Sequence, residues 1–211
     1  MAKEKKQSMI KDALILCAIS LIAALALGFV NELTKDRIAF LEAQAKAAAY
    51  QAVFPEAVAV VEATDNEILA ATLKEAKEIL ATGGHNATIN EACIVQDADG
   101  NIIGYVASVT VKAYDSMTLT VGYTTEGVCT GVEYLELNET VGIGTKVDNP
   151  DFKGQFVNKK AEQFTAVKSA SAEDEINAIS GATFSTNGVV NGVNAGIYFL
   201  SELNSRIGGA N

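Results

Sequence analysis

Apolar and polar positions follow three different patterns along the chain, and each pattern predicts a different structure. Residues 13–30 are an apolar stretch without a charged side chain, about the length that a helix needs to cross the hydrocarbon core of a membrane. Residues 31–53 are rich in Ala, Leu, Glu and Lys, which favour helix, and Pro55 follows them as a stop signal. The sequence therefore predicts a transmembrane helix that continues without a break into a juxtamembrane helix.

A second helix is predicted after Pro55. Thr64 and Glu67 have the spacing of a capping box at its start, and Gly83-Gly84 is a typical terminator. The apolar positions of this helix are Ile68, Leu69, Leu73, Ala76 and Leu80.

The pattern then changes to that of strands. Four short segments rich in Val, Ile, Thr and Tyr are separated by hairpin-type turns, at residues 91–97, 102–111, 117–124 and 128–137. A further short strand is predicted at residues 164–168, and apolar spacings of three and four predict an amphipathic helix over residues 187–205. The predicted fold is α+β: a single N-terminal transmembrane helix, followed by an exported domain with an antiparallel sheet packed by helices.

The distribution of charge predicts the orientation in the membrane. Residues 1–30 contain four lysines and two acidic residues, a net charge of +2, whereas the whole chain has a net charge of -10. The positive-inside rule makes residues 1–12 a cytoplasmic N-terminus, residues 13–30 the transmembrane helix, residues 31–55 the juxtamembrane helix and residues 56–211 an extracytoplasmic domain, on the periplasmic or extracellular side. The alternative is a cleaved signal peptide, because Ala24-Leu25-Ala26 fits a cleavage pattern; it exports the same domain.

Composition excludes several kinds of chemistry. The acidic remainder repels phosphate backbones, so no nucleic acid is expected as a partner. Cys17, Cys93 and Cys129 form no C-x-x-C pair, and His85 is the only histidine, so the sequence predicts no zinc, haem or iron–sulfur site. His85 lies in a Gly-Gly-His-Asn turn, which argues against a histidine-based hydrolase. Cys93 and Cys129 form either a disulfide or two buried free thiols, and the sequence leaves both open.

Two stretches have the composition of a ligand site. The first precedes the last predicted helix and reads Ser180-Gly181-Ala182-Thr183-Phe184-Ser185-Thr186-Asn187-Gly188. Free backbone N–H groups and the positive end of the helix dipole favour a phosphate at such a position, and small residues let the backbone approach it. The alternative is that Ser185, Thr186 or Asn187 simply caps the helix.

The second stretch follows the fourth strand directly. It reads Asn138-Glu139-Thr140-Val141-Gly142-Ile143-Gly144-Thr145-Lys146. Its two glycines would let the loop fold tightly over a flat ligand. The alternative is an ordinary loop with glycine at positive φ.

These two stretches carry a family resemblance. Ser180-Gly181-Ala182-Thr183 resembles the S-G-A-T signature of proteins that receive flavin mononucleotide (FMN) from a dedicated flavin transferase, and residues 139–146 resemble the E-T-P-G-L-G stretch of the same FMN-binding domain. Their order and spacing behind a membrane helix resemble the G subunit of the Rnf complex and, more distantly, the C subunit of the sodium-pumping NADH:quinone reductase. The likeness covers nearly the whole chain.

The resemblance implies an electron-relay subunit, not a stand-alone enzyme. Complexes of this kind couple electron transfer between ferredoxin and NAD to the movement of Na⁺ or H⁺. Thr183 would hold FMN through a phosphoester, with Phe184 or Ile143 against the ring. The remaining cofactor-binding residues implied are Ser180, Gly181, Ala182, Ser185, Glu139, Thr140, Gly142, Ile143, Gly144, Thr145 and Lys146. The implied partners are other membrane subunits, the flavin transferase and membrane lipid.

Two departures from the family pattern stand out. Asn177 occupies the position where the transferase signature usually has an aspartate, and Val141 and Ile143 replace proline and leucine in the second stretch. Two alternatives stay open. One is the C subunit named above, which carries the same signature but is by resemblance a longer protein. The other, kept because of Asn177, is a cofactor-free, membrane-tethered binding protein that uses its sheet as an interaction surface.

Overall fold

The chain begins with one long helix. The computed structural model describes residues 2–209, and helix α1 runs over Ala2–Val53. Two compact units meet within this helix, the first ending at Ala45 and the second beginning at Lys46. As the sequence predicts, the helix continues past Val30 without a break. It ends two residues before Pro55.

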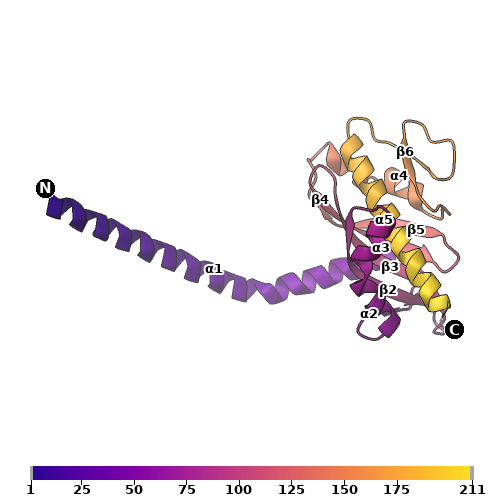
Figure 1. Cartoon of the computed structure of the whole chain (residues 1–211), viewed down its shortest axis with the longest axis horizontal. Coiled ribbons are helices and arrows are strands. Elements are labelled where there is room, and N and C mark those ends of the chain that lie inside the picture. The colour runs from indigo at the N-terminus through magenta and orange to yellow at the C-terminus, as the bar shows by residue number, and fades with distance from the viewer. Residues whose placement is uncertain (1, 210–211) are drawn as a thin grey trace. The chain divides into compact units, whose positions relative to one another are not determined.

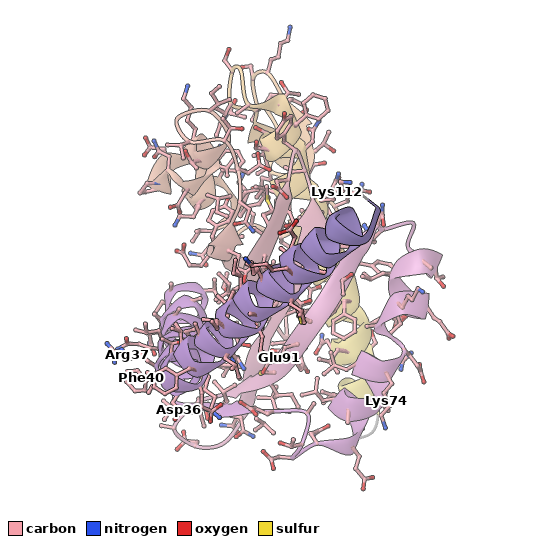
Figure 2. All side chains as sticks on the ribbon, turned by 90° about the vertical axis from the view of Figure 1, so that its left-hand side faces the viewer. Asp36, Arg37, Phe40, Lys74, Glu91 and Lys112 are labelled. Carbon is pink, nitrogen blue, oxygen red and sulfur yellow. The ribbon has the colours of Figure 1, made fainter. Side chains whose placement is uncertain are left out.

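The described part of the first unit is helix alone, and its apolar side chains from residue 11 to residue 45 are exposed. In the part of the chain that the structure describes, α1 is the one helix long and apolar enough to cross a membrane, with a candidate span of Lys11–Val53. Past the apolar run, the guanidinium carbon of Arg37 lies 5.5 Å from the ring centre of Phe40, and Figure 2 labels this pair.

The second unit is built on an antiparallel sheet of five strands, which confirms the α+β prediction. The strands are β1 (Ala59–Val61), β2 (Ala87–Gln96), β3 (Ile102–Lys112), β4 (Ser116–Thr124) and β5 (Cys129–Leu137). They lie in sequence order, each paired antiparallel with the next. Strands β3, β4 and β5 match the predicted segments to within one residue, and β2 begins four residues before its predicted start. The short edge strand β1 has too few residues to show a strand pattern in the sequence.

Helix α5 (Thr183–Gly208) covers one face of this sheet (Figure 1). Three glycines spaced four apart, Gly188, Gly192 and Gly196, form its contact stripe. A Cβ at Gly188 would lie 2.3 Å from Ala113 Cβ, and one at Gly192 would lie 2.5 Å from a methyl carbon of Leu119. The missing side chains therefore let the helix backbone approach the sheet closely.

The end of α1 covers the opposite face. Tyr50, Val53 and Phe54 are buried there against residues Cys93, Val95 and Val106 of the sheet. The interaction explains why residues from Lys46 onward belong to the second unit. Cys93 and Cys129 are free thiols, so the disulfide alternative is wrong.

The second predicted helix is divided in two. Helix α2 (Glu67–Lys74) and helix α3 (Ala76–Thr82) are separated at Glu75. The backbone of Glu75 has φ of -89° and ψ of -1°, which depart from ideal helix values. Its carboxylate accepts a hydrogen bond from Arg206 at 2.8 Å. The capping prediction for Thr64 is wrong, because the side chain of Asn66 accepts from the Leu69 N–H instead.

Short elements connect the sheet to α5. They are 3-10 helix η1 (Gly144–Asp148), helix α4 (Pro150–Lys153), 3-10 helix η2 (Gly154–Phe156) and strands β6 (Thr165–Val167) and β7 (Glu175–Asn177). The strand predicted at residues 164–168 is present, but it pairs in parallel with β7 in a separate sheet. Phe152, Phe156 and Phe164 pack edge to face in a chain and hold this connection together.

Candidate functional site

The final helix begins at Thr183, four residues before the predicted start. Its N-cap is Ala182, which makes no side-chain capping bond, so the capping role considered for Ser185, Thr186 or Asn187 is wrong. The next two hydroxyls after Thr183 both have partners, that of Ser185 in a remote segment and that of Thr186 in the chain just before the helix, which lets polar residues occupy the start of the helix. Thr186 Oγ1 accepts from the Ile179 N–H at 3.2 Å, and Ser185 donates to a carboxylate described below.

Thr183 differs from both of these neighbours. It is exposed, and no partner of its hydroxyl is found within residues 2–209. Gly181 precedes it with φ of +80°, a conformation that glycine adopts without strain. The first N–H groups of a helix have no acceptor within the helix, and α5 has no acidic residue in its first turn. The turn thus presents an accessible hydroxyl beside unpaired donors at the positive end of a helix dipole.

The loop after β5 is folded tightly around the carbonyl of Thr140. That carbonyl accepts from the N–H groups of Ile143, Gly144 and Thr145 at 3.2, 2.8 and 3.3 Å. Gly142 has φ of +77°, and its N–H donates to Thr145 Oγ1 at 2.9 Å. This folding leaves Val141 and Ile143 exposed on the surface.

Glu139 connects the two stretches that the sequence analysis singled out. The residue is 7% exposed, and its Oε2 accepts a hydrogen bond from Ser185 Oγ at 2.6 Å. Gly144 packs onto this bond, since a Cβ there would lie 2.5 Å from Glu139 Oε2 and 2.8 Å from Ser185 Oγ. The loop and the start of α5 therefore form one site.

A third segment, which could not be recognised from the sequence, contacts both the loop and the start of α5. The turn between β3 and β4 contains Asp115, whose N–H donates to Glu139 Oε1 at 3.1 Å, and Ala113, against which Gly188 packs. Tyr114 between them is 73% exposed. The one sequence signal for this contact is Gly188 in the first turns of α5, because a glycine within a helix often marks a close approach.

The other predicted residues lie around this junction. Thr140, Gly142, Lys146, Ser180 and Gly181 are exposed, Thr145 is half-buried, and Ala182 is buried. Lys146 also borders a shallow groove of about 450 Å³ that includes Asn177 and Ile179.

Asn177 has a structural part in this region. Its Oδ1 accepts from the Ala170 N–H at 2.7 Å, and its own N–H donates to Gln155 Oε1 at 2.7 Å. An aspartate could accept from Ala170 in the same way, so the backbone geometry does not require the amide.

Comparison with known proteins identifies the family. Residues 1–53 match the RnfG N-terminal region, and residues 113–198 match the FMN-binding domain. The G subunit of the Na⁺-translocating ferredoxin:NAD⁺ oxidoreductase complex of Acetobacterium woodii is 30% identical over 202 residues, which are 92% of this chain and 92% of that protein. The chain belongs to the RnfG family.

Other relatives support the same assignment. The G subunit of the ion-translocating oxidoreductase complex of Methanosarcina acetivorans is 25% identical over 185 residues, 87% of this RnfG-family chain and 89% of that protein. The C subunit of the Na⁺-translocating NADH-quinone reductase of Pasteurella multocida is 39% identical, but over 71 residues, 29% of this chain and 26% of that protein. The full-length likeness is thus to RnfG proteins, and with α1 it makes this chain membrane-anchored.

Proposed function

We propose that this chain is the electron-relay subunit of an ion-translocating ferredoxin:NAD⁺ oxidoreductase complex, and that it carries FMN esterified through its phosphate to Thr183. The observation that carries the proposal is the exposed Thr183 hydroxyl on the first turn of α5, inside the region that matches the FMN-binding domain. In net composition the chain gains one FMN and loses one water when the ester forms.

The residues around Thr183 suit the binding of a phosphate group. The N–H groups of Thr183, Phe184 and Ser185 are the three at the start of α5 that helix geometry leaves without a helical acceptor. Gly181 at positive φ adds no side chain beside them. A phosphate ester on Thr183 would lie at the positive end of a 26-residue helix.

The residues around the site also fit a flat, largely apolar ring. Phe184 is 74% exposed and Ile143 is 52% exposed, and both belong to segments joined at Glu139. Large apolar side chains in water are costly to leave uncovered, so a ring lying against either one would remove apolar surface from solvent.

FMN, when bound, supplies the electron-accepting and electron-donating chemistry. The protein supplies retention, position and partial exclusion of water. Retention by a covalent bond does not depend on affinity, which matters on the extracytoplasmic side, where a dissociated FMN would be diluted away.

The proposal includes a location and partners. The lysines before residue 13 favour a cytoplasmic N-terminus, which places the second unit outside the cytoplasm. The apolar, exposed side chains of residues 13–30 suit contact with lipid and with other membrane subunits of the complex. Attachment of FMN at Thr183 requires a flavin transferase acting on the same side.

The test is Thr183→Val in the full chain, produced together with a flavin transferase. Wild type should show the mass of the polypeptide plus FMN less one water, and flavin fluorescence in the denatured band; Thr183→Val should show neither. Ser180→Ala and Ser185→Ala are the control variants, and both should keep the fluorescent band. A wild-type chain of bare polypeptide mass, or a fluorescent Thr183→Val band, would refute the attachment.

A further inference from the structure

Glu139 is a buried carboxylate that joins three separate segments of the second unit. We propose that Glu139 is the positioning residue of the flavin site, holding the β3–β4 turn, the loop after β5 and the start of α5 in a fixed arrangement around Thr183. The inference rests on the proposed FMN attachment. The Glu139 junction is defined here as Glu139, Asp115, Gly144 and Ser185.

Both carboxylate oxygens of Glu139 have a partner from a different segment. Oε1 accepts the Asp115 N–H at 3.1 Å, and Oε2 accepts the Ser185 hydroxyl at 2.6 Å. Burial of a carboxylate is unfavourable unless it is hydrogen-bonded, so these two bonds depend on one another. If one segment moves, an oxygen of a buried acid loses its donor.

Steric contacts restrict the same junction from the sides. Gly144 leaves space for the Glu139–Ser185 bond, since any side chain there would lie within 2.8 Å of both partners. Gly188 leaves space for Ala113, and this contact holds the turn against α5. The three segments are thus locked by packing as well as by hydrogen bonds.

Three of the four residues of the junction directly follow a large exposed apolar side chain. Tyr114 precedes Asp115, Ile143 precedes Gly144, and Phe184 precedes Ser185. Val141, two residues after Glu139, is the most exposed of the group at 88%. The junction therefore fixes the backbone beneath the apolar side chains that lie in the same three segments, while Glu139 itself is too buried to cover the ring.

The experiment compares Glu139→Ala, Glu139→Gln and Ser185→Ala in the full chain with FMN attached. Glu139→Ala should keep the ester mass, but lower the fluorescence anisotropy of the attached flavin and shift its midpoint potential, because the ring loses a fixed environment. Glu139→Gln keeps an acceptor oxygen, so its fluorescence anisotropy and midpoint potential should lie between those of Glu139→Ala and those of wild type. Glu136→Ala, an exposed glutamate on β5, is the matched control and should leave both unchanged.

A second measurement does not need flavin. In the Thr183→Val background, amide hydrogen exchange should be followed at residues 142–146 and at Thr186, whose N–H groups are hydrogen-bonded in the fold. It should be about tenfold faster or more in Glu139→Ala, and faster by a smaller factor in Ser185→Ala. If Glu139→Ala does not fold, Ser185→Ala, which removes one bond only, decides the question with both measurements.

The outcomes separate the two proposals. Absence of an FMN adduct on wild type contradicts the attachment, and the exchange measurement still tests the junction. An intact ester with unchanged anisotropy, potential and exchange in the Glu139 and Ser185 variants overturns the positioning role.

Discussion

Among single residues, three hydroxyls in one helical turn have different surroundings. Ser185 donates to Glu139, Thr186 accepts from Ile179, and Thr183 is exposed to solvent. A transferase can reach the oxygen of Thr183 without breaking a hydrogen bond of the described fold. The other two hydroxyls already form hydrogen bonds that hold the turn in place. This difference favours Thr183 as the proposed attachment site, and composition alone does not reveal it.

The two thiols of the second unit lead to a prediction about single side chains. Burial raises the pKa of Cys93 to about 11 and that of Cys129 to about 12, so both stay protonated at neutral pH. At pH 8 we expect iodoacetamide to leave both unmodified in the native chain, and to modify both after denaturation. Peptide mass spectrometry measures this. Rapid native labelling of either thiol would contradict the burial described here.

The sign of the pH dependence follows from the raised pKa values. A thiol with a raised pKa in the fold ionises first in the unfolded chain, so its burial stabilises the fold below pH 9 and loses this effect as pH rises toward 11 or 12. Stability should therefore fall in the alkaline range, and less so in a Cys93→Ser, Cys129→Ser chain, whose hydroxyls do not titrate there.

Among the elements, α5 depends on glycines that would weaken an isolated helix. Gly188→Ala raises helix propensity by about 1 kcal/mol, yet the added Cβ would lie 2.3 Å from Ala113 Cβ and 3.2 Å from its Cα. We expect a net loss of roughly 1–3 kcal/mol in the free energy of unfolding, from urea denaturation.

Gly208→Ala is the matched control for this prediction. It belongs to the same helix, but nothing lies within 4 Å of its added Cβ. Its stability should equal or slightly exceed that of wild type. Equal stability of Gly188→Ala and Gly208→Ala would show that α5 and the β3–β4 turn are packed less closely than described.

In the molecule as a whole, the boundary between the two units lies inside a continuous helix. We expect a chain that begins at Lys46 to fold, because it keeps Tyr50, Val53 and Phe54 on the sheet. A chain that begins at Glu56 exposes Cys93, Val95 and Val106, and should lose roughly 3–5 kcal/mol of unfolding free energy, comparable to removing a large core side chain. Identical urea midpoints for the two chains would refute this role of α1.

Most of the elements could be predicted from the amino-acid sequence, which also indicated where along the chain the candidate site lies. Charge-free apolar length predicted the membrane helix, and segments rich in Val, Ile, Thr and Tyr between hairpin-type turns predicted the long strands. The family resemblance of two short motifs pointed to Thr183 and to the loop after β5. These features depend on residues close together in sequence, where periodicity records which side of an element is buried.

The way in which these parts meet came from the folded chain and could not be predicted. Glu139 and Ser185 are 46 positions apart, and Asp115 contributes a backbone group that no motif marks. Helix α5 starts four residues earlier than predicted, with the Ser185 hydroxyl paired to the remote Glu139. A polar side chain is stable inside a helix or a core only when a partner satisfies it there. Such a partner often lies in a segment that is remote in the sequence and is brought close only by folding. The local spacing of residues does not predict it.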